Sequence, residues 1–223
     1  MVNQEFKEDP RLISFNTLRK AVGWLGILLP AAILTGNLIF SNCHHIQDSI
    51  SHYYFTATGS LFVGTLCAVA LFLISYKGYP DDKKDNILTT LAGLFALGIA
   101  FFPTNNNSNN SCAIVALPDG DIRRIVHYVC ATLFFILLAG ISFFLFTKSK
   151  GEVTEMKLMR NKLYKTCGVL IIIFVAGIAL YGIFAKHLHQ LDKYKPIFWL
   201  EWMALLAFGI SWLVKGELVL KDK

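Results

Sequence analysis

The sequence predicts an all-α integral membrane protein, a bundle of six transmembrane helices with both termini on the cytoplasmic side. Hydrophobic residues make up 55% of the chain and charged residues only 16%, with a mean hydropathy of +0.52. So little charge cannot solvate the outside of a water-soluble protein of this composition. Several apolar runs also approach the roughly 17–25 residues that cross a hydrocarbon core. We therefore expect residues 1–223 to form a single transmembrane domain.

The apolar runs place the predicted spans along the chain. They cover residues of about 22–40, 59–76, 87–102, 125–147, 166–185 and 197–214. The first run is too long for the apolar core of a signal peptide, and no small-residue cleavage site follows it, so we expect it to remain as a span. Pro30 removes a backbone donor and predicts a bend there. A separate, short interfacial helix is expected from Glu155 to Tyr164.

The basic residues predict the orientation of these spans. Sixteen of the 21 Lys and Arg residues fall in the N-terminal tail, the connection after the second span, the loop 148–165 and the C-terminal tail. Basic residues concentrate on the cytoplasmic side of membrane proteins, so these segments are expected there, in a membrane of the bacterial inner-membrane type. Because the cations flank the spans instead of forming one basic face, the net charge of +6 does not indicate nucleic-acid binding. The expected partners are membrane lipids.

The segment from Asn42 to Tyr54 is the first candidate for function. It holds three of the six histidines, together with Asp48 and Tyr53. In the predicted topology His52 precedes the second span, while His127 and Glu201 lie in the first turns of the fourth and sixth. These three spans run from the outside inward, so the three side chains are expected at one depth near the outer surface.

Three interpretations of this set remain open. Imidazole and carboxylate groups at equal depth are typical of a zinc site with an open water position, which makes His52, His127 and Glu201 candidate metal ligands. The second interpretation is ordinary interfacial polarity, with Glu201 stabilised by the positive end of its helix. The third is a metal-free ligand site. No nucleophile motif accompanies Ser49 or Ser51, so no catalytic residue is assigned.

Two other pairs on the outer side complete the candidates. Arg123 and Arg124 form the only adjacent basic pair there, and guanidinium groups hold phosphates or carboxylates through forked hydrogen bonds. The alternative is contact with the headgroups of bulk lipid. Cys43 and Cys112 lie in the first and second outer loops, where an oxidising compartment permits a disulfide. The sequence gives no distance between them, so unpaired thiols remain an alternative.

Several segments resemble known bacterial proteins. They include Ser49-Ile50-Ser51-His52-Tyr53-Tyr54, Phe102-Pro103-Thr104 and Phe198-Trp199-Leu200-Glu201. Together they resemble the domain-of-unknown-function-998 group of multi-span inner-membrane proteins, over most of the chain, and this resemblance implies no mechanism.

A more distant similarity is to the membrane hydrolase superfamily of alkaline ceramidases and progestin-receptor-like proteins. That resemblance implies a serine, an aspartate and three histidines around zinc. Asp48, Ser51, His52 and His127 match part of this set. The late H-x-x-x-H pair of the superfamily is replaced here by His187-Leu188-His189.

The sequence thus supports three functional hypotheses. The first is a polytopic membrane protein of unassigned activity, in which an outward-facing polar pocket binds a lipid headgroup or small ligand. The expected ligand-binding residues are Asp48, His52, Tyr53, Arg123, Arg124, His127 and Glu201. The second is a metal-dependent hydrolase of lipid amide or ester bonds, and the third is a small transporter. The oligomeric state is not predicted.

Overall fold

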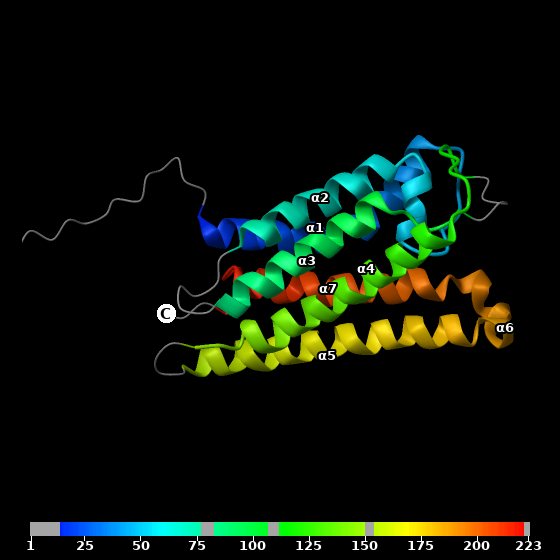
Figure 1. The fold of residues 1–223 in the computed structure, drawn as a ribbon. Coiled ribbons are helices and arrows are strands. Elements are labelled where there is room, and N and C mark those ends of the chain that lie inside the picture. Colours follow the sequence, from blue (N-terminus) through cyan, green and yellow to red (C-terminus); the bar gives the residue numbers. More distant parts are fainter. Residues whose placement is uncertain (1–13, 77–82, 107–111, 150–153, 221–223) are drawn as a thin grey trace, which may run out of the picture.

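Every regular element is helical in the computed structural model, which describes residues 14–76, 83–106, 112–149 and 154–220. The long helices run side by side (Figure 1). They are α1 (Phe15–Phe40), α2 (Gly59–Ser75), α3 (Lys83–Phe101), α4 (Asp121–Gly140), α5 (Glu155–Ile183) and α7 (Pro196–Lys215). Short elements are η1 (Ser51–Phe55), the π-helical turn η2 (Ile141–Leu145), α6 (Ala185–Leu188) and η3 (His189–Tyr194). The predicted all-α class is confirmed for the described residues.

Five of the long helices have the length and apolar composition needed to cross a membrane. They are α1, α3, α4 together with η2, α5 and α7, whereas α2 is also apolar but has 17 residues. Large apolar side chains cover their outer faces, and Leu71, Phe144 and Ile183 are all more than 60% exposed. Apolar surface of this kind suits lipid better than water. Six spans and their orientation remain predictions.

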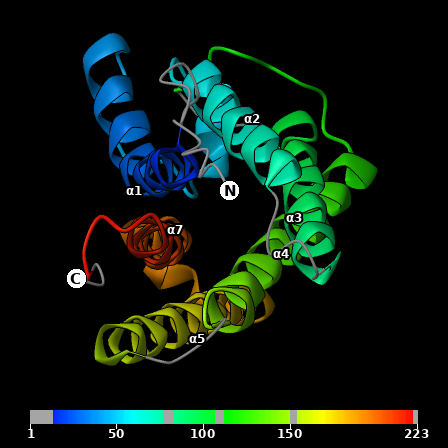
Figure 2. The same cartoon turned by 90° about the vertical axis from the view of Figure 1, so that its left-hand side faces the viewer.

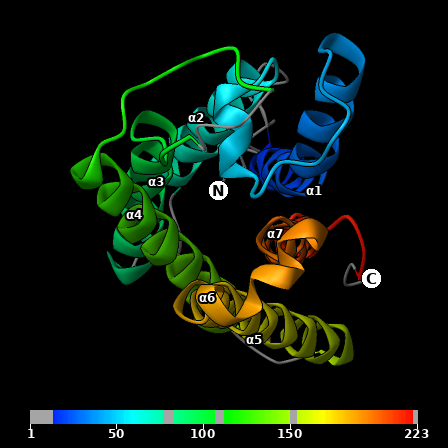
Figure 3. The same cartoon turned by 90° about the vertical axis from the view of Figure 1, so that its right-hand side faces the viewer.

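The six long helices form a ring when the bundle is viewed along its length (Figures 2 and 3). Each helix contacts the next one in chain order, and α7 packs against both α5 and α1. The first and last helices thereby close the ring. Small residues allow the closest approach: a Cβ added to Gly209 of α7 would lie 2.5 Å from the carbonyl oxygen of Gly23 in α1. Close backbone contact is a common basis of helix association in lipid.

The helices extend beyond the predicted apolar runs. Residues 166–185 are only part of α5, which begins at Glu155 after Thr154 caps it by accepting a hydrogen bond from the amide of Lys157. The prediction of a separate interfacial helix from Glu155 to Tyr164 was therefore wrong, because this stretch is the first part of α5. The helix α1 contains Pro30, and it changes direction along its length as the sequence predicts (Figure 2).

The short elements divide the bundle into two chemically different ends. One end, here called the α6 end, holds η1, α6 and η3 together with the first turns of α4 and α7 (Figure 1). The opposite end holds η2, the first turns of α1 and α5, and the last turn of α7. Trp212 is fully buried near this opposite end, with the rings of Phe72, Tyr76 and Phe146 at 5.1–5.5 Å.

Candidate functional site

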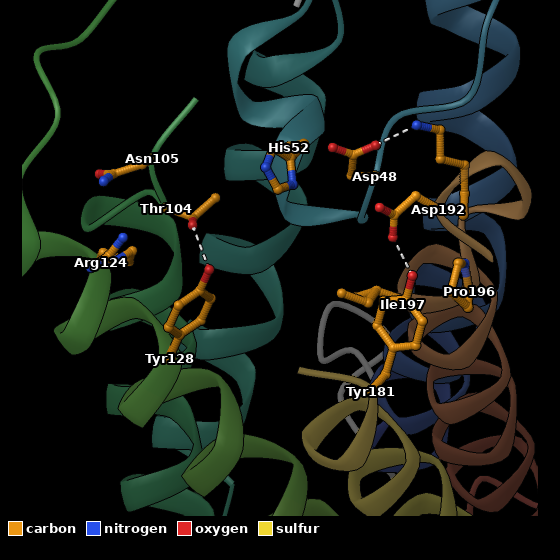
Figure 4. Close-up of a pocket in the computed structure, with 11 residues that line it drawn as sticks. Asp48, His52, Thr104, Asn105, Arg124, Tyr128, Tyr181, Asp192, Pro196 and Ile197 are labelled. Atoms are coloured by element: carbon orange, nitrogen blue, oxygen red, sulfur yellow. Dashed lines mark hydrogen bonds and ion pairs between the residues drawn. The ribbon is translucent and has the colours of Figure 1, made fainter. Parts of the chain in front are cut away.

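A polar cavity of about 460 Å³ opens at the α6 end (Figure 4). Its walls come from the segment before η1, η1 itself, the segment after α3, and from α4, α5, η3 and α7. The residues that line it are Asp48, His52, Thr104, Asn105, Arg124, Tyr128, Tyr181, Asp192, Lys195, Pro196 and Ile197. Its volume is within the range of small-molecule sites, roughly 300–1,000 Å³.

The segment between α1 and α2, which carries Asp48 and His52, is linked to the segment between α3 and α4. A disulfide joins Cys43 to Cys112, with the two Cα atoms 5.1 Å apart. The amide of Ile114 also donates to the carbonyl oxygen of Phe55 at 2.8 Å. A covalent bond and a backbone hydrogen bond therefore hold these two segments together at the α6 end.

Tyr53 packs η1 against α7. Its side chain is fully buried, its ring lies 5.9 Å from that of Phe198, and its hydroxyl oxygen accepts a 3.5 Å hydrogen bond from the amide of Gln47. Burial raises the pKa of Tyr53 to about 12, so the phenol is neutral at physiological pH. Tyr53 therefore supports the cavity without lining it.

His52 lies over the cavity in a fixed orientation. Its Nδ1 is 2.6 Å from the hydroxyl oxygen of Ser49, and that oxygen also accepts the backbone amide of His52 at 3.2 Å. Two hydrogen bonds with Ser49 therefore hold the ring in place. Burial lowers the pKa of His52, and the charge of Asp48 opposes this shift. The ring is therefore neutral at physiological pH, and its tautomer with the proton on Nε2 offers an N–H donor.

The start of α7 forms the far wall. Lys195 precedes Pro196, the first residue of α7, and has a left-handed backbone with φ of 53°. Its ammonium group pairs with Asp48 at 2.5 Å. One turn further along, the carboxylate of Glu201 accepts the amide of Ile50 at 2.6 Å. An ion pair and a hydrogen bond thus hold the segment before η1 against the start of α7.

Arg124 lies on one wall of the cavity, and both carboxylates of the lining lie on the other together with Lys195. Figure 4 shows Arg124 and Tyr128 on one side, Asp48 and Asp192 on the other, and His52 between them. Arg124 pairs with Asp121 at 2.7 Å, and the hydroxyl of Tyr181 donates to Asp192. The lining contains two carboxylates and two cations, Lys195 being the second, so its formal charge is zero when His52 is neutral.

Three of the predicted ligand-binding residues line the cavity: Asp48, His52 and Arg124. Arg123, in the first turn of α4, instead reaches the segment after α3, where it donates to the carbonyl oxygen of Pro103 at 3.0 Å and to Asn105 at 3.1 Å. That arginine therefore braces the segment after α3.

His127 and Glu201 do lie at the α6 end, but each side chain is hydrogen-bonded to a backbone group. His127 is buried, with Nδ1 2.9 Å from the carbonyl oxygen of Phe102, and it is near enough to His52 for an electrostatic interaction. Glu201 holds the amide of Ile50 as described above. Both residues serve to position the cavity, and neither lines it.

The predicted zinc ligands do not gather in the described residues. Within these ranges one group of three His, Cys, Asp or Glu residues has ligand atoms within 4.8 Å of one another: Cys43, His45 and Cys112. Two of these are joined in the disulfide, and a thiolate is the form of cysteine that binds metals. His52, His127 and Glu201 are not such a group, so the geometry gives the zinc prediction no support.

The sequence-based prediction missed the second charged wall. Tyr181, Asp192 and Lys195 come from the end of α5, from η3 and from the residue before α7. None belongs to a recognisable motif. The available signal was an acid and a base just before Pro196, at the predicted outer end of the last span.

Comparison of the chain with protein-family models, curated proteins and solved structures found no match. The resemblance to the domain-of-unknown-function-998 group stays a prediction. A functional argument for this protein must therefore rest on the geometry and chemistry of the cavity.

Proposed function

We propose that this chain is a six-span protein of a bacterial-type inner membrane, with both termini cytoplasmic, and that its outward cavity binds a zwitterionic phospholipid headgroup or a soluble ligand of the same chemistry. Five apolar helices of spanning length, with the apolar α2, support this number of spans. The concentration of Lys and Arg on alternate connections supports the orientation. Under this topology the α6 end faces outward.

The opposed charges of the cavity carry the proposal. Arg124 is a donor for a phosphate, and His52 is a second donor when Ser49 donates to its Nδ1; charge-assisted bonds to a phosphate are about twice as strong as neutral ones. Asp192 on the other wall is an acceptor for an ammonium group. A ligand that joins a phosphate to an amine through a short linker satisfies both walls at once.

The remaining charges of the site are already matched. Asp48 is engaged by Lys195 at 2.5 Å. Arg124 does pair with Asp121, but their side chains are 45% and 79% exposed, and exposed pairs contribute little. Arg124 can therefore exchange this partner for a ligand phosphate.

The apolar surface beside the cavity favours a lipid as the source of the headgroup. Ile122 and Ile125, on the same turns of α4 as Arg124, are 81% and 57% exposed. Isoleucines exposed to this degree would suit contact with acyl chains below the headgroup region. A lipid could thus place its headgroup in the cavity and its chains along α4.

No feature of the cavity favours hydrolysis. Ser49 is only 5% exposed, and its hydroxyl is engaged by both the ring and the amide of His52. A buried hydroxyl used in this way orients the histidine and has no access to a substrate bond. The binding proposal therefore stands alone.

Calorimetric titration with glycerophosphoethanolamine, the headgroup without its acyl chains, tests the proposal on purified protein in detergent. Saturable binding is expected. Arg124→Gln and Asp192→Asn should each weaken it roughly 10- to 100-fold, since each removes a charged hydrogen-bonding partner worth about 1.5–3 kcal/mol. Lys193→Gln is the matched control, because Lys193 lies exposed on η3 beside Asp192 and does not line the cavity.

Two fragments of the headgroup test the contribution of each wall separately. Glycerol 3-phosphate lacks the amine and ethanolamine lacks the phosphate, so both should bind more weakly than the intact headgroup. The amine wall has no role if glycerol 3-phosphate binds as tightly as the headgroup and Asp192→Asn has no effect. Absence of saturable binding by the wild-type protein would refute the proposed function.

A further inference from the structure

Four basic side chains gather at the opposite end of the bundle. Arg19 lies on α1, Lys157 and Arg160 on α5, and Lys215 on the last turn of α7. The first three are each close enough to Lys215 to interact with it electrostatically. Figure 2 looks onto this end and shows α7 between α1 and α5. Side chains from three helices, far apart in sequence, thus form one basic cluster.

The cluster lies against aromatic rings and is shielded from water. All four side chains are half-buried. The Nζ atom of Lys215 lies 5.4 Å from the centre of the Phe146 ring, and the guanidinium of Arg19 lies 4.6 Å from that of Phe15. Like charges repel one another more strongly in such surroundings than in water, because the local dielectric is lower. This repulsion is unfavourable for Arg19 and Lys215 unless an anion compensates their charges.

Protein carboxylates do not compensate the two inner cations. Within the described ranges, neither Arg19 nor Lys215 forms an ion pair with an acidic residue. Asp85 is near Lys215 but pairs with Lys148 at 2.6 Å. Glu217 is exposed and accepts a hydrogen bond from Asn16.

Arg19 has an unused donor as well. Its two terminal nitrogens donate to neutral groups, the side-chain oxygen of Asn16 at 2.9 Å and the hydroxyl of Tyr76 at 3.1 Å. Its Nε is buried and has no hydrogen-bond partner. Buried donors are normally satisfied, so an unsatisfied one beside three further cations indicates a missing acceptor.

We propose that Arg19, Lys215, Lys157 and Arg160 form a binding site for a phosphate group, supplied either by an anionic phospholipid of the adjacent leaflet or by a small soluble phosphate. A phosphate offers several acceptor oxygens to donors that converge from different helices. Basic pockets between transmembrane helices on the cytoplasmic side recognise lipid headgroups in the same way. A bound phosphate would link α1, α5 and α7, and the site is independent of the cavity at the α6 end.

The ordinary excess of basic residues beside membrane spans does not account for this cluster. Lys162 is an example of that excess: it lies on α5 two residues after Arg160 and is exposed. Arg19 and Lys215 instead are half-buried, each against an aromatic ring. Lys162→Gln therefore removes a charge of the diffuse kind, and Lys215→Met removes one from the cluster.

Thermal unfolding measures the site through ligand-linked stabilisation. The protein is compared in nanodiscs of phosphatidylcholine alone and in nanodiscs that also contain phosphatidylglycerol, and in detergent with inorganic phosphate or with chloride at equal ionic strength. An upward shift of the unfolding midpoint is expected with phosphatidylglycerol, with phosphate, or with both. A shift with the lipid alone identifies the headgroup as the source, and a shift with inorganic phosphate identifies a soluble ligand.

The variants decide whether the shift comes from the cluster. Lys215→Met and Arg19→Gln should each lose most of the shift, whereas Lys162→Gln should keep it. Lys215→Met relieves repulsion and is expected to fold, and its undiminished binding of glycerophosphoethanolamine at the α6 end would verify this. Native mass spectrometry of bound phosphatidylglycerol gives a second readout. The proposal is overturned if the wild-type protein shows no shift, or if Lys215→Met and Lys162→Gln respond alike.

Discussion

The contact between Glu201 and the amide of Ile50 links the start of η1 to α7. Replacement of Glu201 by alanine leaves this amide without its acceptor, in a residue that is 4% exposed. The lost bond is 2.6 Å long and its acceptor is a carboxyl oxygen. A neutral hydrogen bond contributes about 0.5–1.5 kcal/mol, and a buried amide left without an acceptor costs about 1–3 kcal/mol. We expect Glu201→Ala to lower the free energy of unfolding by about 2–3 kcal/mol.

Replacement of Glu201 by glutamine keeps a hydrogen-bond acceptor at this position but removes the ionisable group. Glu201→Gln retains a carbonyl acceptor, and a neutral hydrogen bond contributes about 0.5–1.5 kcal/mol, so the loss should be about 1 kcal/mol. Unfolding in mixed micelles with increasing sodium dodecyl sulfate measures both variants. The fluorescence of Trp199 and Trp202 reports on the first turns of α7.

Glu155→Gln provides the matched control, because Glu155 lies near the start of a long helix, as Glu201 does, but is exposed. Its effect should stay within about 0.5 kcal/mol. The reasoning is refuted if Glu201→Ala has an equally small effect, because the amide of Ile50 would then have another acceptor in solution.

Three further predictions concern the framework of the cavity. Gly209→Ala forces a methyl group against the backbone of α1 and should cost about 1–3 kcal/mol in the same unfolding assay, whereas Gly182→Ala, which meets nothing within 4 Å, should be neutral or slightly stabilising. Cys43→Ser removes a link across 69 residues and should lower stability by up to about 4 kcal/mol; equal unfolding midpoints with and without reductant would argue against the bond. Because the pKa of His52 lies below its ordinary 6.5 in the folded protein, the unfolded chain takes up the proton first, so stability should fall as the pH drops below about 6.5. The His52→Gln variant should show a weaker dependence, and parallel pH profiles of the unfolding midpoint would contradict the assignment.

Length and hydropathy were sufficient to locate the long helices but not their ends. Each predicted span overlaps one long helix, because an apolar run of this length is stable in lipid only when its backbone groups bond internally. The polar first turns at Asp121 and Glu155 are helical without being apolar. For this reason only residues of about 166–185 were predicted as a span, although α5 is one helix from Glu155 to Ile183.

Site residues could be predicted only where the order of the spans alone determines which end of the bundle they occupy. Asp48, His52 and Arg124 lie beside span ends, so their place at one end of the bundle followed from the sequence. The partners of His127 and Glu201 are backbone atoms of Phe102 and Ile50, and no sequence pattern reveals such contacts. Asp192 reaches the cavity through the packing of η3, which depends on the whole ring.

The outward orientation of the cavity is the central claim, and labelling of intact cells with a membrane-impermeant maleimide tests it most directly. Single cysteines are introduced in a variant in which the free cysteines Cys67, Cys130 and Cys167 are replaced. Lys193→Cys reports on η3 at the cavity, and Lys162→Cys reports on the opposite end; both positions are exposed. We predict labelling at position 193 in intact cells and at position 162 only after permeabilisation. Labelling at 162 with protection at 193 would place the cavity in the cytoplasm and contradict the account.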